Sequence, residues 1–318
     1  MWLLPLSFPM LPGPCLAVVS PAPFRQVDRK VLAMGTELRL HLEGGIDLVR
    51  ASEAALAESA RIEAACSTWD PTSIWSRLND AQGRPVPLEP EWLALLAEMK
   101  RWQQRTEGAF DPVLLALVRA WGLRSGATTP SVRDLVEARE ASGADLLDLD
   151  MAAGTARLRN ARAGLEEGGF LKGYALDRMR KASEAQSGWI DFGGQILAWG
   201  RPRPVSIADP SDRHRPWVHL VLQNASLSCS GTSERGRHIL DPRRGEPCAA
   251  RGATAVVAPL ALTADVLSTA LYVLGPEAGL AWAEAHQVAA AFLLNDGQIR
   301  MTRAFHDLQP TLTQPESR

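Results

Sequence analysis

Residues 262–275 read LTADVLSTALYVLG, an apolar run that predicts a helix with Thr263 as its N-cap and Gly275-Pro276 as its end. Residues 253–258 before it are typical of a strand, and residues 289–294 and 298–302 after it predict a hairpin around Asn295-Asp296-Gly297. Strands and helices are mixed without regular alternation. We therefore predict an α+β fold with mixed or antiparallel sheets and packed helices.

Working outward, the N-terminal half contains mainly helical patterns. Residues 31–42 have the alternation of a strand after Gly35-Thr36, and residues 46–65 form an amphipathic helical pattern. A loop is expected over 66–83, followed by helices over 89–106, 113–121 and 134–141. Residues 146–158 predict two short strands.

The C-terminal half contains more strand patterns. A helix is expected over 172–185, followed by a strand-like run over 189–199 that carries Gly193-Gly194. Residues 205–208 and 218–222 predict paired strands, and further strands are expected over 226–230 and 238–240. A last helix is predicted over 277–286.

Composition limits the function classes. Of 318 residues, 46% are hydrophobic and 22% charged, which excludes disorder as the general state. Thirty-four basic against 36 acidic residues give a net charge of −2, which argues against a general nucleic-acid binder. The four cysteines contain no Cys-x-x-Cys pair, so neither a zinc knuckle nor a disulfide scaffold is expected.

The first 24 residues carry no charged side chain but six prolines, which argues against a membrane-spanning helix. The segment is also a poor export signal, although Ser20-Pro21-Ala22 is similar to a cleavage site and the residues before Cys15 resemble a lipoprotein box. A disordered or wrongly assigned start is the alternative. We predict three parts: a leader or disordered segment over 1–26, one domain over 27–306 and a tail over 307–318.

Asp265, Ser268 and Thr269 lie at i, i+3 and i+4 on one face of the predicted helix. A carboxylate with nearby hydroxyls suits a hard cation such as Mg²⁺, which keeps water or phosphate as its other ligands. Alternatively, Asp265 complements the helix N-terminus and Thr269 packs. His238 precedes an Asp-Pro turn among arginines, where it could serve an anionic substrate or be structural.

Gly168-Gly169 precede a predicted helix with Lys172 in its first turn, an arrangement that favours phosphate. The spacing fits neither a P-loop nor a dinucleotide fingerprint. Asp191-Phe192-Gly193 lacks the companion motifs of a kinase. Trp69 and Phe110 could stack on a flat ring system or simply belong to the core.

The motifs occur in one order along the chain: MGT (34–36), STWDPTSIWSRLND (67–80), GAFDP (108–112), GGFLKGYALD (168–177), DFGGQ (191–195), SGTSERGRHILDPRRGEP (230–247) and TADVLSTALYVLGPEAGL (263–280). From about residue 27 to 305, this ordered set resembles the ApbE-type FAD:protein FMN transferases. The resemblance implies an ApbE-like fold with the flavin site in a cleft between sub-domains. It also implies an Mg²⁺-dependent enzyme that moves the FMN half of FAD onto a Thr or Ser hydroxyl of an acceptor protein and releases AMP.

Carried over motif by motif, the resemblance implies a set of site residues. Those expected to bind FAD are Met34, Trp69, Ala109, Phe110, Asp111, Glu166, Lys172 and Ile239. Asp265, Thr269 and the Gly169 carbonyl would hold Mg²⁺, with Ser268 nearby. His238 would assist the attacking hydroxyl, so that His238 and Asp265 are the expected catalytic residues.

The chain departs from the family pattern at several positions. Glu166-Glu167 stands where Asp-Leu is common, Gln195 where Asp is common, and Leu115-Ala116 where Gly-Pro is common. Two alternatives stay open: an FAD pyrophosphatase that gives FMN and AMP, and a non-catalytic FAD-binding protein. The family is largely exported, which favours a periplasmic or membrane-associated location, while the weak leader leaves the cytoplasm open.

Overall fold

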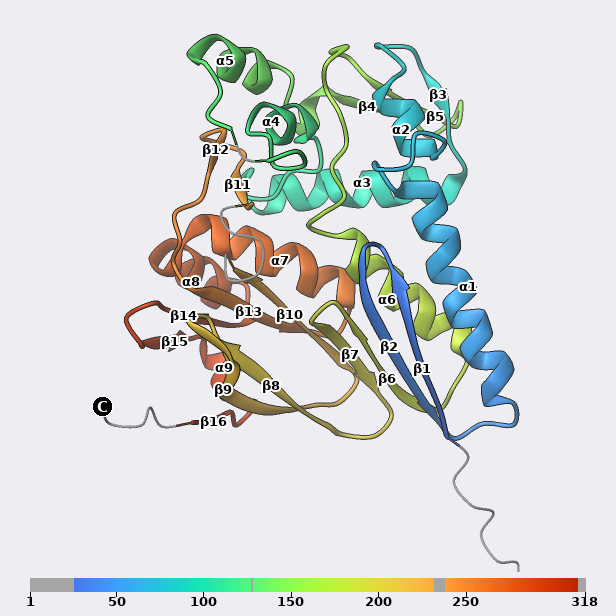
Figure 1. The fold of residues 1–318 in the computed structure, drawn as a ribbon, viewed down its shortest axis with the longest axis vertical. Coiled ribbons are helices and arrows are strands. Elements are labelled where there is room, and N and C mark those ends of the chain that lie inside the picture. The colour runs from blue at the N-terminus through green and yellow to red at the C-terminus, as the bar shows by residue number, and fades with distance from the viewer. Residues whose placement is uncertain (1–25, 127, 232–237, 314–318) are drawn as a thin grey trace, which may run out of the picture.

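The computed structural model describes residues 26–126, 128–231 and 238–313. Its centre is an eight-stranded antiparallel sheet in the order β1-β2-β6-β7-β10-β13-β14-β15 (Figure 1). The strands are β1 (Gln26–Ala33), β2 (Thr36–Glu43), β6 (Ser187–Phe192), β7 (Gln195–Trp199), β10 (Ala225–Gly231), β13 (Ala253–Ala258), β14 (Ala289–Leu293) and β15 (Ile299–Met301).

Helices cover one face of this sheet. They are α1 (Leu48–Cys66), α6 (Leu171–Ser183), α7 (Ala261–Leu274) and α8 (Pro276–Ala285). Helix α7 lies over β10 and β13 and also packs against α6, which in turn packs against α1. Because both of its faces are covered, β13 is buried over residues 254–258 and carries no charged side chain, unlike a strand with one solvated face.

The opposite face packs against a smaller sheet in the order β16-β9-β8. Its elements are β8 (Arg203–Asp209), β9 (Asp212–Leu222) and β16 (Thr311–Leu312), and α9 (Arg303–His306) lies beside β14. A second apolar core fills this interface, with Trp217, Val257 and Phe305 among its members. Strand β16 lies within residues 307–318, the predicted C-terminal tail.

The remaining elements form an upper group above α6 and α7 (Figure 1). This group contains α2 (Ile74–Asn79), α3 (Pro90–Arg105), α4 (Leu115–Ala120), α5 (Val132–Glu140), the short 3-10 helix η1 (Ala144–Leu146), β3 (Val86–Pro87), β4 (Leu147–Asp150), β5 (Thr155–Leu158), β11 (Leu240–Asp241) and β12 (Glu246–Pro247). A hydrogen bond of 2.8 Å from Trp121 Nε1 to the Gly245 carbonyl ties the end of α4 to the β11–β12 turn.

The α+β prediction is confirmed, and the structure corrects three of its details. The runs 31–42 and 189–199 are hairpins rather than single strands, because Met34-Gly35 and Gly193-Gly194 adopt the positive φ angles of tight turns. The predicted loop 66–83 contains α2, whose N-cap Ser73 accepts a hydrogen bond from Ser76 N.

The N-cap of α7 is the third correction. The helix begins at Ala261, so Thr263 is inside it. Asp177 of α6 supplies the cap, since its two carboxylate oxygens accept from Ala261 N at 2.8 Å and Leu262 N at 2.9 Å. A tertiary cap of this kind leaves no local sequence signal.

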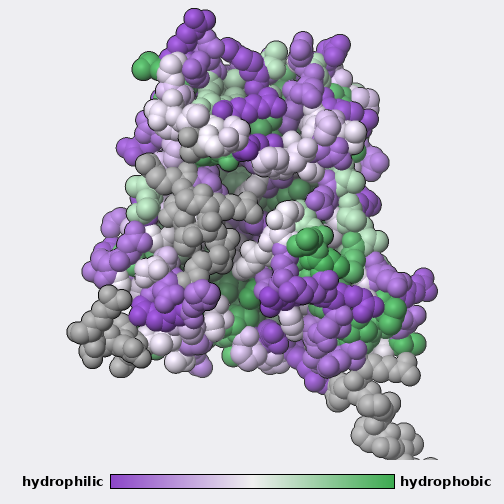
Figure 2. All heavy atoms as spheres, viewed as in Figure 1, coloured by the Kyte–Doolittle hydropathy of each residue, from purple (hydrophilic) through white to green (hydrophobic). Residues whose placement is uncertain are grey.

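The visible surface is mostly hydrophilic, with an apolar area over the β1–β2 hairpin (Figure 2). Leu32 on β1 is 86% exposed. Among the described residues, no helix is both long enough and apolar enough to cross a membrane. The leader prediction, including Cys15, concerns residues outside the described ones.

Candidate active site

Helix α7 carries the expected metal-binding residues. It is buried on nearly every side, yet Asp265 and Ser268 are among its buried residues. A buried carboxylate on an apolar helix is unusual, because a buried charge is costly without a partner. Asp265 Oδ2 accepts one hydrogen bond, from Gly173 N at 2.9 Å. Burial raises the pKa of Asp265, and the positive charge of nearby Lys172 opposes that rise.

Helices α6 and α7 touch at Gly173. A Cβ built at this position would lie 2.5 Å from the Ala261 carbonyl oxygen and 2.8 Å from Asp265 Cβ. Only glycine permits this approach, which lets the backbone amide reach the carboxylate. The glycine-rich start of α6 is therefore held beside the first turns of α7.

A chain of hydroxyl groups runs beneath this contact. Ser268 Oγ donates to the Asp265 carbonyl at 3.0 Å and lies 2.9 Å from Ser230 Oγ, which lies 3.3 Å from Thr269 Oγ1. With Ser268 donating to the Asp265 carbonyl, an arrangement that satisfies every contact has Ser230 donating to Ser268 and Thr269 donating to Ser230. Both lone pairs of Thr269 then remain available to a cation. Ser228, 3.1 Å from Ser268, completes the chain.

Gly169 lies beside Thr269, because a Cβ built there would be 3.4 Å from Thr269 Oγ1 and 3.5 Å from Phe110 Cε2. The Phe110 ring packs edge-on against Phe170 with centroids 5.9 Å apart, and Phe170 packs against Trp75 at 5.6 Å. Phe110 is buried, so its ring belongs to the hydrophobic core. Neither face of the ring is exposed for stacking on a ligand.

Ala109 and Asp111 also lie in the interior. Asp111 accepts from Val113 N at 2.8 Å and from Ala144 N at 2.9 Å, so both of its oxygens organise the backbone of the upper group. Burial raises the pKa of Asp111 to about 6. The neighbouring Pro112 carbonyl accepts from Glu166 N at 2.9 Å, which places the Phe110 segment beside the Glu166 segment.

Glu166 and Trp69 meet at Arg124, a residue that sequence reasoning missed. Arg124 forms an ion pair with Glu166, and its guanidinium carbon lies 4.4 Å from the centroid of the Trp69 ring. Burial and the charge of Glu167 raise the pKa of Glu166 to about 7, and Arg124 opposes the rise. No local pattern identifies Arg124, since its partners are distant in the sequence.

The other expected residues are spread around this centre. Met34 occupies the β1–β2 turn with φ of 46° and packs against the main core. Lys172 is half-buried in the first turn of α6, within electrostatic reach of Asp265. His238 is half-buried just before β11, and the Ile239 carbonyl accepts from Cys248 N at 2.8 Å.

Two departures from the family pattern have structural roles. Gln195 is buried and donates from Nε2 to the Ala261 carbonyl at 2.8 Å, so it helps to hold the start of α7. Leu115 packs tightly on Gly164, where a Cβ would lie 2.6 Å from Leu115 Cδ2. Neither residue removes a group that the candidate metal site needs.

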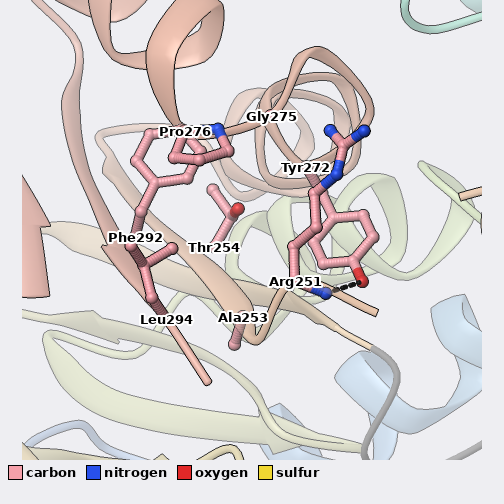
Figure 3. Close-up of a pocket in the computed structure, with 8 residues that line it drawn as sticks. All are labelled: Arg251, Ala253, Thr254, Tyr272, Gly275, Pro276, Phe292 and Leu294. Atoms are coloured by element: carbon pink, nitrogen blue, oxygen red, sulfur yellow. Dashed lines mark hydrogen bonds between the residues drawn. The ribbon is translucent and has the colours of Figure 1, made fainter. Parts of the chain in front are cut away.

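A niche at the C-terminal end of α7 is not a second site. Figure 3 shows Arg251 and Tyr272 beside Gly275 and Pro276, with Arg251 N donating to Tyr272 Oη at 3.4 Å. The niche has a cavity volume of about 0 Å³, so it admits no water. It is packing between α7, β13 and β14.

The oxygen donors fit a hard cation. Asp265 and Thr269 of α7 lie beside the turn before α6 that contains Gly169, and one carboxylate with neutral oxygens is typical of Mg²⁺ sites. Among the described residues, no cluster of three or more His, Cys, Asp and Glu side chains could hold a metal.

Comparison with known proteins identifies the family. The chain is 28% identical over 279 residues to the FAD:protein FMN transferase of Haemophilus influenzae, covering 79% of this chain and 81% of that protein. The Treponema pallidum protein of the same name is 27% identical and covers 89% and 88%.

Solved structures of ApbE proteins have the same fold as this chain. The Pseudomonas stutzeri flavinyl transferase ApbE, apo form, matches with a TM-score of 0.81 and 28% identity over 91% of this chain and 98% of that chain. The Thermotoga maritima ApbE protein matches with a TM-score of 0.83 at 25% identity, over 89% and 99%. The model of the ApbE family itself matches residues 34–293, and so the chain belongs to the ApbE family.

Proposed function

We propose that this protein transfers the FMN part of FAD to a Thr or Ser hydroxyl of an acceptor protein and releases AMP. Membership of the ApbE family supports the proposal, as do relatives named FAD:protein FMN transferase that match most of both chains. The acceptor is a protein that presents a Thr or Ser hydroxyl, and by the same resemblance we propose a periplasmic or membrane-associated location.

One observation carries the proposal: a carboxylate buried on an apolar helix beside a hydroxyl whose lone pairs are free. Among the described residues, Asp265 is compensated only by the hydrogen bond from Gly173 N and the nearby charge of Lys172, and burying a carboxylate with so little compensation is costly. A cation held by Asp265, Thr269 and the Gly169 carbonyl would remove that cost. When bound, Mg²⁺ would offset the negative charge of the pyrophosphate.

The reaction exchanges one phosphorus–oxygen bond for another. The acceptor hydroxyl oxygen attacks the phosphorus on the FMN side of the pyrophosphate, and the bond to the AMP phosphate oxygen breaks with its electron pair. AMP leaves, and the hydroxyl proton passes to a base, for which we propose His238. The protein mainly holds the groups in line, as in other phosphoryl transfers.

The other residues would bind the two ends of FAD. Lys172, in the first turn of α6, would suit the pyrophosphate, because it brings a positive charge to a helix N-terminus, where anions are favoured. We propose that Met34, Trp69 and Glu166 contact the flavin part. Ala109, Phe110 and Asp111 would shape the pocket from the interior rather than bind through exposed faces. Ile239, also buried, would support the segment that carries His238.

The test is incubation of the protein with FAD and Mg²⁺, with and without a domain bearing the acceptor hydroxyl, followed by measurement of AMP and of protein-bound flavin. AMP together with covalent flavin on the acceptor is the expected result. AMP with free FMN only would make the protein an FAD pyrophosphatase. Bound FAD without AMP would leave an FAD-binding protein.

Two variants sharpen this test. Asp265→Asn keeps the shape of the side chain but removes the charge, and we expect a loss of about hundredfold or more, since such charge stabilisation is worth several kcal/mol. A general base contributes about 10²–10⁴-fold. We expect the His238→Ala loss at saturating Mg²⁺ to be near the lower end of that range and the Asp265→Asn loss to exceed it. An Asp265→Asn protein with unchanged activity would refute the assignment.

A further inference from the structure

Arg124 joins three segments that are far apart in the sequence. Arg124 lies just after α4. Its side chain contacts Thr68 and Trp69, which follow α1, and the two glutamates that precede α6, Glu166 and Glu167. Nη1 donates to the Thr68 carbonyl at 3.1 Å, and Nη2 binds Thr68 Oγ1 and Glu166 Oε2. Glu167 Oε2 lies 3.6 Å away and also accepts from Thr68 Oγ1. The guanidinium is therefore held from several sides at once.

This arrangement fixes the Trp69 indole. The guanidinium covers one face of the ring at 4.4 Å, while 66% of the Trp69 surface is exposed. The exposed area must come from the other face and the edges. An indole held on one face and open on the other is ready to stack on a flat ring, and fixing it beforehand lowers the entropy cost of binding.

Arg124 also compensates the charge of two neighbouring carboxylates. The side chains of Glu166 and Glu167 are 20% and 12% exposed, so their mutual repulsion is poorly screened. Without the guanidinium, this pair would disfavour any anionic substrate nearby. With it, the Glu166 carboxyl stays in one place beside Trp69.

We propose that Arg124 is a positioning residue for the flavin-ring end of FAD, holding Trp69 and Glu166 in the arrangement that the ring meets. The inference rests on the proposed function. The ring end is favoured over the phosphate end because three of the Arg124 hydrogen bonds already go to Thr68 and Glu166. A guanidinium neutralised in this way has little attraction left for a pyrophosphate.

The test compares Arg124→Met with the wild-type protein for three ligands: FAD, riboflavin and ADP. Isothermal titration at pH 7 and 150 mM salt gives the three dissociation constants. We expect FAD and riboflavin to weaken together, by roughly tenfold for a partly desolvated cation–π contact, and ADP to be unchanged. Arg124→Lys should recover little, since it keeps the charge but loses the planar fork.

A double-mutant cycle with Trp69→Ala separates positioning from a general loss of structure. If Arg124 acts through Trp69, adding Arg124→Met to Trp69→Ala should weaken riboflavin by clearly less than it does in the wild-type background. Arg133→Met is the matched control, because Arg133 is an 86% exposed arginine paired with Glu137 on α5. That control should leave all three ligands unchanged.

Four outcomes would overturn the inference. Weaker ADP with unchanged riboflavin would make Arg124 a phosphate ligand. Equal weakening of all ligands with a lower melting temperature, or full additivity with Trp69→Ala, would make it merely structural. A wild-type protein that binds FAD but transfers no flavin refutes the proposed function alone, whereas one that binds neither FAD nor riboflavin refutes both.

Discussion

Replacing Gly173 with alanine tests whether the close contact of α6 and α7 builds the candidate active site. The added Cβ would lie 2.5 Å from the Ala261 carbonyl oxygen and 2.8 Å from both the Ala261 carbonyl carbon and Asp265 Cβ. The first two atoms are backbone, so no change of rotamer can relieve the overlap. Helix α7 must move away from α6, and Asp265 must move with it.

Two effects of opposite sign set the size of the change. Alanine is favoured over glycine inside a helix by about 1 kcal/mol. Overpacking costs about 1–3 kcal/mol, and losing the hydrogen bond from Gly173 N to the Asp265 carboxylate costs about 1.5–3 kcal/mol more. The steric and hydrogen-bond costs together exceed the gain in helix propensity, and we expect a net loss of about 2–4 kcal/mol in the free energy of unfolding.

Thermal and urea unfolding measure this loss, and titration with Mg²⁺ or Mn²⁺ in the presence of FAD measures the effect on the site. Gly168→Ala is the matched control, because its Cβ would meet only Glu166 Oε1, at 3.4 Å. It should melt close to the wild-type protein. A Gly173→Ala protein that is as stable as wild type and binds the cation normally would refute the reasoning.

Three further predictions follow from single contacts. Asp177→Ala removes the side-chain cap of α7 and should cost about 1–2 kcal/mol in urea unfolding; an unchanged midpoint would contradict the cap. Ser230→Ala leaves the Thr269 proton without its acceptor and should weaken Mn²⁺ binding several-fold by titration, with little change in melting temperature; unchanged affinity would count against the hydroxyl chain. Burial raises the pKa of Asp111 to about 6, so its contribution to stability is fully present below about pH 4 and is lost as pH rises through 6. Unfolding measured from pH 4 to 7 should lose about 2–3 kcal/mol more in wild type than in Asp111→Asn, and parallel curves would refute this assignment.

Sequence patterns predicted most of the elements because each is a local property. Local helical patterns predicted α1, α3, α6 and α7 within a few residues. Helix α2 was missed because it has only six residues, although Ser73 offers the usual N-cap signal. Pairing the eight strands, by contrast, requires knowledge of the tertiary fold, since β6 lies beside β2 across a long connection.

The candidate site was also predicted only where its residues are close together in the sequence. Asp265, Ser268 and Thr269 share one helix, so their spacing alone brings them together. Arg124 and Asp177 could not be found, because their partners lie 42 and 84 residues away along the chain. Ser230 stands in a motif that was recognised, but only the structure places its hydroxyl between Ser268 and Thr269.

The fold separates the groups proposed for the reaction from those proposed for recognition. Asp265 and Thr269 lie on a helix that is packed against the sheet and against α6, so the positions of their oxygens are fixed by the core. Trp69, Arg124 and Glu166 lie on connecting segments and are held by contacts with one another and with other connecting residues, Thr68 and Pro112. Changes in α7 should therefore act mainly on cation binding and rate, whereas changes in the connecting segments should act on the affinity for FAD. A substitution of Arg124 that lowered the rate at saturating FAD without changing its affinity would contradict this division.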